Sequence, residues 1–443
     1  MERRLLVGGL AAVAGVALIG AGVRSLPYAA TGLSGVPGTP SSPAPAQVPG
    51  QVPGLSPSGA RPVAASASAA SPSAATSSPS PSPSATTASA ATATSCGNGA
   101  TDAEVVRSGG TWTARRAGRT TYTGTDMQSA VEAGIASLTA GRTAKQRVVV
   151  RGSGTVSASA RIKLPSFTTI DVCGTIDVVG PSATDMAPIF ARDVTDIEVE
   201  HLTVTGTPMY GIFMRDVTNV KLGRIDLRLS SGLGVRIDNG GTGAFSKNIK
   251  IDQVYVSGAS SHAVETAGVD GLTIGTVTAR NVGEAGLLLN TTINATIGTV
   301  DAVNAGAGTG YAAFRMANRN GRVGDAYPAN IKVGLVKARG GGRGVFCVSE
   351  SGGATIGRID IAGTGGNAIL IENCYNVTIA AEGGTVSGGG EIRLAARSTF
   401  ANTSGVMLRK LTIKDNHIKE APCVDGLTIT DVKVDTPSDI DRC

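Results

Sequence analysis

Gly271-Leu-Thr-Ile-Gly-Thr-Val277 returns further along the chain as Asn294-Ala-Thr-Ile-Gly-Thr-Val300, and similar phrases recur on both sides of this pair. Eight of them begin at positions 196, 219, 248, 271, 294, 330, 353 and 376, so that the successive spacings are 23, 29, 23, 23, 36, 23 and 23. A unit of about 23 residues with two enlarged copies is typical of a stacked solenoid. Each phrase alternates apolar and polar residues, which predicts short strands, and no helical pattern lies between them. The sequence therefore predicts an all-β fold, a parallel β-helix.

The second half of each repeat predicts which residues face the core, because residues two apart share one face of a strand. Two columns of this segment are apolar apart from Thr266, and we expect them to form the core: Ile212, Val235, Val264, Leu287, Phe314, Val345 and Ile369, and Met214, Ile237, Thr266, Leu289, Met316, Cys347 and Ile371. The alternate column is mixed, and we expect it to face outward and to hold any chemistry: Phe213, Arg236, Glu265, Leu288, Arg315, Phe346 and Leu370.

The chain divides into three segments by composition. Residues 1–24 have a charged start and an apolar run, which indicates a signal peptide or a membrane anchor. Residues 25–95 are rich in Pro, Ser, Ala and Thr and are predicted to be a disordered linker. Residues 96–443 form the predicted β-helix domain, in which Thr125–Leu138 is expected to be a capping helix.

Composition indicates an exported protein. Both interpretations of the N-terminal segment place the remainder outside the cytoplasm, and membrane contact is expected only through that segment. The formal net charge of +6 over 443 residues says little about partners, and we expect no nucleic-acid partner. The six cysteines suggest disulfides. Cys96 with Cys173 and Cys423 with Cys443 are plausible pairs, whereas stacking alone does not guarantee that Cys347 meets Cys374.

The two enlarged repeats indicate one side of the solenoid as a binding surface. Their extra residues fall near Gly240–Lys247 and Ala317–Ala329, after the same strand of the coil. Insertions on one face of a repeat protein often line its binding surface, although solvated loops beside ordinary surface charges would look the same. Residues in or beside these loops are the predicted substrate-binding groups: Arg215, Asn239, Asn290, Arg319 and Arg322.

The charged outward residues suggest an acidic ligand. Arginine forms planar, two-bond contacts with carboxylates, so Arg215, Arg236 and Arg315 on one face suit a polymer of uronic acids. A ladder of exposed ion pairs, such as Arg236 with Glu265, is the alternative interpretation. His262 precedes the outward column and is the candidate general base, since histidine titrates near neutrality. Tyr210 is a candidate proton donor or a sugar-stacking ring.

The repeat unit, the corner residues Asn219, Asn248, Asn294, Asn330 and Asn376, and the helix lid resemble the pectate-lyase-like superfamily of right-handed parallel β-helix proteins. The resemblance extends over about residues 145–435. It implies a secreted carbohydrate-active protein that grips a polysaccharide in an outward groove. Pectate lyases hold Ca²⁺ with clustered acidic residues, whereas this chain offers only Asp238 and Glu265, so calcium is weakly supported. The multi-aspartate motif of polygalacturonase-type hydrolases is missing.

Three functions follow from these observations. The first is a lyase that cleaves a uronic-acid polysaccharide, of the pectin or glycosaminoglycan type, by β-elimination, with Arg236 and Arg315 neutralising the carboxylate and His262 as base. Tyr210 or a water would be the acid, and Asp238 and Glu265 would orient these groups or bind a cation. The second is an inverting glycoside hydrolase that uses Asp238 and Glu265, whose positions predict a separation of roughly 7–8 Å. The third is a non-catalytic carbohydrate-binding surface protein.

Overall fold

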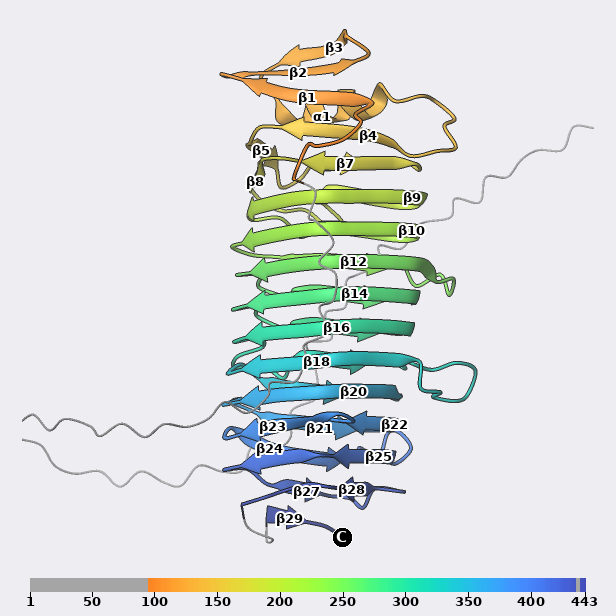
Figure 1. The fold of residues 1–443 in the computed structure, drawn as a ribbon, viewed down its shortest axis with the longest axis vertical. Coiled ribbons are helices and arrows are strands. Elements are labelled where there is room, and N and C mark those ends of the chain that lie inside the picture. The colour runs from red at the N-terminus through yellow and green to blue at the C-terminus, as the bar shows by residue number, and fades with distance from the viewer. Residues whose placement is uncertain (1–94, 436–438) are drawn as a thin grey trace, which may run out of the picture. The chain divides into compact units, whose positions relative to one another are not determined.

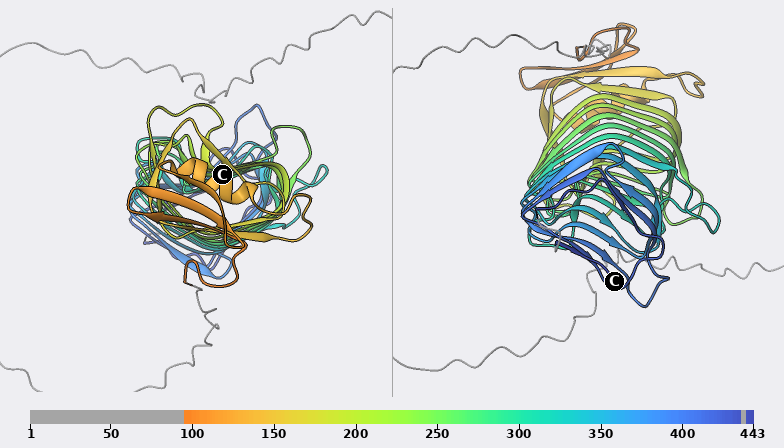
Figure 2. Two further views of the ribbon diagram at one scale, coloured as in Figure 1. Left: turned by 90° about the horizontal axis from the view of Figure 1, so that it is seen from above. Right: turned by 60° about the horizontal axis from the view of Figure 1, so that its bottom comes forward.

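A computed structural model describes residues 95–435 and 439–443, and it is an all-β parallel solenoid with one short helix. Figure 1 shows the strands stacked along the long axis, and Figure 2 shows the coils from above and from below. The predicted signal or anchor (1–24) lies outside the described residues, as does the linker (25–95) except for its last residue. No helix among the described residues is long and apolar enough to cross a membrane.

One side of each coil is a short strand, and we call these strands the short series. It begins with the first halves of β9 (Ala187–Gly206) and β10 (Tyr210–Leu229), which bend through a corner of the coil. The series continues with β11 (Leu233–Asp238), β13 (Val264–Ala267), β15 (Leu287–Asn290), β17 (Ala312–Ala317), β19 (Arg343–Cys347), β21 (Asn367–Glu372), β24 (Gly390–Ala395), β27 (Ile418–Glu420) and β29 (Ile440–Asp441).

The repeated phrases form a second set of strands, the long series. It comprises β4 (Gln146–Arg151), β7 (Thr168–Val172), the second halves of β9 and β10, β12 (Ser246–Ser257), β14 (Val269–Arg280), β16 (Ile293–Val303), β18 (Ile331–Arg339) and β20 (Ser351–Ala362). Towards the C-terminal end this side is divided into β22 (Cys374–Ile379), β23 (Gly383–Ser387), β25 (Ser404–Arg409), β26 (Leu411–Lys414) and β28 (Thr428–Thr430). Near the N-terminal end β5 (Gly154–Ser157), β6 (Arg161–Lys163) and β8 (Thr175–Val179) complete the coils.

The predicted register is confirmed. Ile251 pairs with Ile274 and Ile274 with Ile297, so that each residue lies beside its counterpart in the next repeat. The six-residue enlargement lies between β11 and β12, as expected, because Arg215 pairs with Asp238 but Thr218 pairs with Lys247.

The larger insertion is divided, which the sequence did not indicate. Asn290 pairs with Ala317, an offset of 27 in the numbering, whereas Ala295 pairs with Ile331, an offset of 36. Compared with the usual offset of 23, four of the extra residues therefore precede the end of β17 and nine follow it. Loops beside β12 and β18 project from the same side of the solenoid (Figure 1).

Asparagine at the corners has a conformational reason. Asn219, Asn248 and Asn294 have φ of 57°, 55° and 54°, in the left-handed region that asparagine tolerates better than most residues. Two of these corners are also joined by a hydrogen bond, since Asn248 Nδ2 donates to Asn219 Oδ1 at 2.7 Å. Asn330 departs from this pattern: it follows the longer loop, and its amide donates to the Gly321 carbonyl at 3.0 Å.

Both predicted core columns are buried. Val235, Val264 and Leu287 are fully buried, as are their neighbours Ile237 and Leu289. The polar exception, Thr266, is also fully buried, and its hydroxyl lies 2.9 Å from that of Thr292. The Thr292 hydroxyl in turn donates to the Asn290 carbonyl at 3.0 Å. The core therefore accepts this hydroxyl pair because each group has a partner.

The N-terminal end of the solenoid is closed by a helix and three strands. The helix α1 (Met127–Ala136) is confirmed, with Asp126 as its cap, whose carboxylate accepts from Ser129 N at 2.7 Å. The antiparallel strands β1 (Ala103–Ser108), β2 (Thr111–Arg116) and β3 (Arg119–Gly124) add to this lid, and β1 continues the stack by pairing with β4. Sequence analysis missed these strands because they lie outside the repeat.

All six cysteines form disulfides: Cys96 with Cys173, Cys347 with Cys374, and Cys423 with Cys443. The two terminal pairs are confirmed. Cys347 and Cys374 also meet, because β19 ends at Cys347 and β22 begins at Cys374 across a turn of the coil, with Cα atoms 6.2 Å apart. Disulfides of this kind form in oxidising compartments.

Candidate functional site

The outward residues of the short series form a continuous surface, which we call the outer strip and which runs from Tyr210 to Phe346. The predicted column is in register along it: Phe213 pairs with Arg236, Arg236 with Glu265, Glu265 with Leu288, Leu288 with Arg315, and Arg315 with Phe346. Neighbouring strands in a sheet are about 4.8 Å apart. Residues that lie far apart in the sequence thus become neighbours.

The outer strip is not the exposed ridge that the sequence suggested. Phe213 is fully buried, and Leu288 and Phe346 are 4% and 6% exposed. These side chains belong to two apolar clusters that are separate from the solenoid core. Arg215 lies over Phe213 at 4.8 Å from the ring centre, so long cationic side chains help to cover the apolar ones.

Between the two apolar clusters lies a network of ion pairs. Arg215 donates to Asp238 through Nε and Nη2, at 2.5 and 2.9 Å. Arg236 Nε donates to Asp238 Oδ2 at 2.8 Å, and its Nη1 donates to Glu265 Oε2 at 2.7 Å. Asn290 Nδ2 then donates to Glu265 Oε1 at 3.1 Å. The strip brings these five predicted residues together, although as partners of one another.

The two carboxylates of this network have opposite pKa shifts. Burial raises the pKa of Glu265, and this effect outweighs the opposing charge of Arg236. Burial also acts on Asp238, but its hydrogen bonds from Arg215 and Arg236 prevail, so that the pKa of Asp238 is lowered. The hydrogen bonds to Asp238 raise the pKa of Arg215, against the effect of burial. Burial also acts to lower the pKa of Arg236, but the charge of Glu265 and the contact with Asp238 prevail and raise it.

Asp238 and Glu265 do not suit the hydrolase role. Both oxygens of each carboxylate already accept hydrogen bonds from side chains of the protein. An inverting hydrolase requires one carboxyl group free to protonate the leaving oxygen and another free to activate water. The same contacts place guanidinium groups beside these oxygens, and their positive charge disfavours Ca²⁺, which takes six to eight oxygen ligands.

His262 joins the strip, but its nitrogens are occupied. Its Nδ1 accepts a hydrogen bond from Ala285 N at 3.0 Å, and its Nε2 lies 3.1 Å from Glu284 Oε2. Burial lowers the pKa of His262 to about 3, with a further contribution from the charges of Arg315 and Arg236. A neutral, buried imidazole with no nitrogen lone pair to spare cannot take a proton from a substrate. These contacts and the lowered pKa do not favour the predicted role of His262 as base.

Glu284 is a site residue that sequence reasoning missed. It lies in the turn before β15, one repeat after Ser261, whose hydroxyl donates to Glu284 Oε2. Because one repeat separates the two residues, the periodicity alone would have paired them. The Glu284 side chain is 28% exposed, and no described residue donates to its Oε1.

Arg315 is the cation of the strip that lacks a partner. No carboxylate lies within ion-pair distance among the described residues, and its buried Nε has no hydrogen-bond partner. The guanidinium lies 4.6 Å from the ring centre of Tyr311 and 5.0 Å from that of Phe346. Arg343 lies 4.8 Å from the same Phe346 ring, and burial and the charge of Arg315 lower its pKa.

Tyr311 is the second residue that the sequence did not indicate. It lies in the turn that contains the four residues inserted before β17. Its ring meets that of His262 edge to face, with centroids 5.2 Å apart. No described residue hydrogen-bonds to its hydroxyl. Tyr311, Arg315, His262 and Glu284 therefore form a compact group at one end of the ion-pair network.

Tyr210 stands at the other end of the strip. Its ring stacks on Phe213 at 4.7 Å, and burial raises its pKa. Four strand steps, from β10 through β11, β13 and β15 to β17, separate it from Arg315. At about 4.8 Å a step, Tyr210 cannot act on a sugar whose carboxylate is bound by Arg315. It remains a candidate for stacking on a neighbouring sugar.

The predicted loop residues have local partners. Arg319 Nε donates to Glu350 at 3.1 Å, and Arg322 Nη2 donates to Asp325 at 2.6 Å. Asn239 Oδ1 accepts from Gly241 N at 3.2 Å. These contacts order the two loops beside the strip, but they do not join the cluster around Arg315.

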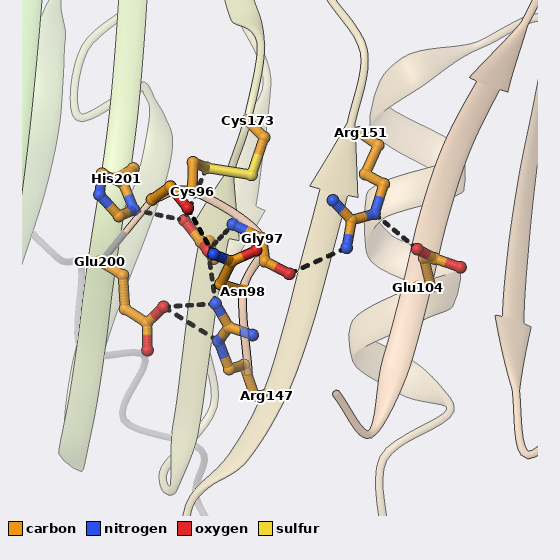
Figure 3. The surroundings of a disulfide bond; sticks show 11 residues. Cys96, Gly97, Asn98, Glu104, Arg147, Arg151, Cys173, Glu200 and His201 are labelled. Carbon is orange, nitrogen blue, oxygen red and sulfur yellow. Dashed lines mark hydrogen bonds and ion pairs between the residues drawn. A yellow bond between two sulfur atoms is a disulfide. The ribbon is translucent and has the colours of Figure 1, made fainter. Parts of the chain in front are cut away.

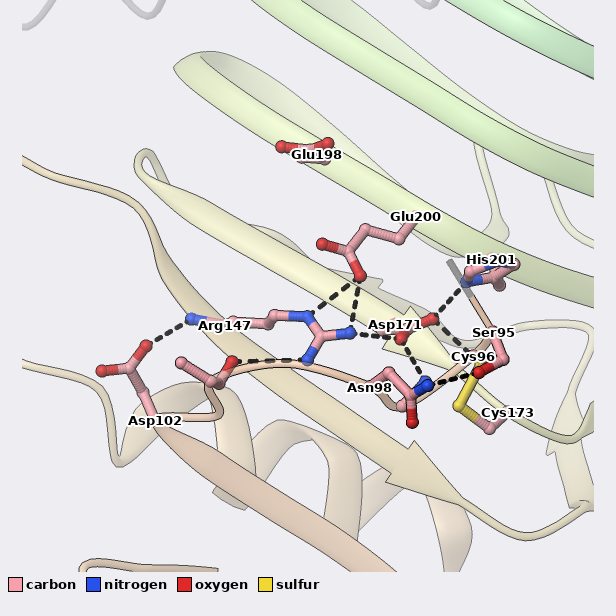
Figure 4. A network of polar contacts seen from close by, with 12 residues as sticks. Ser95, Cys96, Asn98, Asp102, Arg147, Asp171, Cys173, Glu198, Glu200 and His201 are labelled. Carbon is pink, nitrogen blue, oxygen red and sulfur yellow. Dashed lines mark hydrogen bonds and ion pairs between the residues drawn. A yellow bond between two sulfur atoms is a disulfide. The ribbon is translucent and has the colours of Figure 1, made fainter. Parts of the chain in front are cut away.

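A separate polar network lies beside the Cys96–Cys173 disulfide (Figure 3). The buried carboxylate of Asp171 accepts from Gly97 N at 2.7 Å and Arg147 Nη2 at 2.5 Å, and lies 2.8 Å from His201 Nδ1. Asp171, Glu200 and His201 have the spacing of metal ligands. Arg147 lies between the two carboxylates, however, and reaches Glu200 at 2.7 Å (Figure 4). A guanidinium already supplies the positive charge there, so this network is structural.

Comparisons with known proteins give similarity of fold. No protein family and no curated protein sequence matches the chain. Among solved structures, the A-module of a mannuronan C-5 epimerase from Azotobacter vinelandii is similar at 13% identity and a TM-score of 0.35, over 70% of this chain and 96% of that one. The receptor-binding tailspike of bacteriophage Det7 is similar at 10% identity and a TM-score of 0.33, over 65% of this chain and 72% of that one. Both are parallel β-helix proteins.

Proposed function

We propose that the protein is an extracellular enzyme that binds an acidic polysaccharide along the outer strip and cleaves it by β-elimination. The observation that carries this proposal is the unpaired guanidinium of Arg315. A partly buried cation without a counter-charge is costly to the folded protein, and a buried polar atom without a partner calls for an explanation. A carboxylate on the ligand would supply both the charge and the hydrogen-bond acceptor.

The surroundings of Arg315 support a uronate in particular. Arg343 adds a second positive charge, 4.8 Å from the ring centre of Phe346, again without an ion-pair partner among the described residues. Tyr311, which is only partly buried, offers an aromatic ring beside Arg315. A sugar acid has an apolar ring face and a carboxylate, so rings next to guanidinium groups match both parts of it.

β-Elimination needs three groups around one sugar. A cation must neutralise the carboxylate so that the C5 proton becomes acidic, a base must remove that proton, and an acid must protonate the leaving oxygen at C4. Arg315 serves as the cation. The hydroxyl of Tyr311, which no described residue engages, replaces Tyr210 as the acid. Arg236, to which we first gave a neutralising role, is instead committed to Asp238 and Glu265.

An extracellular location of the protein is consistent with this substrate. Acidic polysaccharides occur in cell walls and extracellular matrices, and three disulfides are typical of a protein that works in an oxidising environment. Polysaccharide chains are long, and the strip follows the solenoid axis over several coils. Successive sugars can therefore contact successive strands.

Incubation with acidic and neutral polysaccharides tests the proposal. Pectate, hyaluronan, other glycosaminoglycans and a neutral glucan would be compared by ultraviolet absorbance, which reports the C4=C5 double bond, and by new reducing ends. We expect both signals from at least one acidic polymer and neither from the glucan. Reducing ends without absorbance would show hydrolysis. Saturable binding without either signal would show a non-catalytic binding protein, and both results would overturn the lyase.

A further inference from the structure

We propose that Glu284 is the general base of this reaction and that His262 is the residue that positions it. The inference rests on the proposed function and identifies the proton acceptor that the function requires. Three features support this role: the polar contacts around the turn before β15, the one unoccupied oxygen of Glu284 and the position of Glu284 relative to Arg315.

The orientation of the imidazole follows from its two partners. Ala285 N donates to His262 Nδ1 at 3.0 Å, so Nδ1 is an acceptor and the proton of the neutral ring lies on Nε2. Nε2 lies 3.1 Å from Glu284 Oε2, and the Ser261 hydroxyl donates to the same oxygen. One hydrogen bond, from Ser261, and the close approach of His262 Nε2 thus hold one oxygen of Glu284 in place.

The second oxygen of Glu284 is left for the substrate. No described residue donates to Oε1, and the side chain is 28% exposed. The other carboxylates of the strip differ in this respect, because Asp238 and Glu265 have both oxygens engaged. A carboxylate fixed through one oxygen and open at the other is the arrangement expected of a general base.

The position of Glu284 relative to Arg315 also fits. Glu284 precedes β15, and Arg315 lies on β17, the next strand of the stack. His262 lies 3.1 Å from Glu284, and its ring shares a neighbour with Arg315: the Tyr311 ring centre lies 5.2 Å from that of the imidazole and 4.6 Å from the guanidinium. In a uronate the C5 proton is two bonds from the carboxyl carbon, so its cation and its base must lie close together.

The proposed step is balanced. With the carboxylate of the sugar bound to Arg315, Glu284 Oε1 takes the proton from C5. The electron pair of the C5–H bond forms the C4=C5 double bond, the bond between C4 and the glycosidic oxygen breaks, and that oxygen takes a proton from Tyr311. The products are one chain with an unsaturated uronate end and one with a new hydroxyl, and no oxidant or reductant is required.

Glu284→Gln tests the assignment in the full-length protein. A general base contributes about 10²–10⁴-fold to a rate, so we expect kcat on the acidic polymer that the wild type cleaves to fall by about 10²-fold or more. Binding of an oligouronate, measured by calorimetry, should change by less than about 3-fold, because the contact is made chiefly in the transition state. Glu391→Gln is the matched control: Glu391 is also partly exposed and lies beside a histidine, His417, but it is on β24, beyond the outer strip, and its loss should leave kcat unchanged.

A second variant keeps the test decisive if Glu284→Gln folds poorly. In Glu284→Ala, added formate should restore part of the rate by acting as a mobile base, which a purely structural role would not allow. His262→Gln should lower kcat less than Glu284→Gln and leave oligouronate binding intact, since it loosens the base without removing it. Elimination by Glu284→Gln at a rate within about 3-fold of the wild type, or no rescue by formate, would overturn the assignment while the lyase stands. A wild type that eliminates no acidic polymer would overturn both.

Discussion

Arg315 and Arg236 show that two arginines of one column have different roles. Arg236 is saturated by Asp238 and Glu265 and connects two neighbouring strands. Arg315 has rings beside it but no acceptor. The column itself could be predicted from the sequence, since every second residue of a strand faces one way. Which arginine is already paired depends on side-chain conformations that periodicity does not encode.

Arg315→Gln should weaken binding of an acidic oligosaccharide by about 10-fold to 100-fold, because a hydrogen bond to a charged group contributes about 1.5–3 kcal/mol. Thermal stability should change little, since no ion pair is lost and the loss of the two ring contacts is offset by removal of a partly buried, unpaired charge. Titration calorimetry and thermal unfolding check the two effects. The control is Arg358→Gln, which removes an exposed arginine on the long series. An unchanged affinity for Arg315→Gln would rule out its contact with the ligand.

His262 gives a prediction for acid stability. Its pKa is about 3 in the folded protein, against about 6.5 in an unfolded chain. As the pH falls between these values, the unfolded state takes up the proton first, so the folded state loses stability across this window.

His262→Gln should therefore make denaturant unfolding less dependent on pH between about 6.5 and 3, because glutamine does not titrate. His417→Gln, which alters a half-exposed histidine near the C-terminal end, should leave the wild-type dependence in place. Parallel pH dependences for wild type and His262→Gln would contradict the buried, neutral imidazole.

At the scale of single elements, the sequence repeat predicts the strands but not the structure of the turns between them. The strands of the short series pair as the repeat predicts. The extra residues of the longest repeat were assigned to one loop, whereas four of them precede the end of β17 and shape the turn that contains Tyr311. A count of residues gives the length of an insertion but not its division around a strand.

The Cys347–Cys374 disulfide links two strands on different sides of the coil. A cross-link that closes a loop of this size stabilises a protein by about 2–4 kcal/mol. Replacing both cysteines with alanine should lower the denaturant midpoint of unfolding accordingly, with the loss of buried sulfur atoms adding to the effect. Cys423→Ala with Cys443→Ala, in the terminal pair, is the comparison. An unchanged midpoint for the first variant would show that stacking alone holds these strands.

At the scale of the whole molecule, the sequence repeat produces strands that stack along one axis. The regular spacing of the repeated phrases sufficed to predict the parallel stacking of the long series. The lid of β1, β2 and β3 could not be predicted in this way, since its strands have no counterpart in the repeat. Such lids cover the apolar end that every solenoid exposes.

Deletion of residues 103–124 should therefore cause association. Trp112, Val105 and Ala114 would be lost from the core that they share with α1, leaving an open sheet edge at β4. Light scattering should show aggregates of the deletion variant but not of the intact chain. A deletion variant that is folded and does not aggregate would contradict the role of the lid. Removal of residues 25–94 is the control, because it leaves the lid in place.

The most direct test of the central claim is a crystal structure of the protein with a bound oligouronate, obtained with the slow variant Glu284→Gln. We predict a sugar carboxylate within hydrogen-bond distance of the Arg315 guanidinium, the saccharide running along the outer strip, and C5 of that sugar facing residue 284. A saccharide bound elsewhere on the solenoid, with Arg315 still unpaired, would contradict the account.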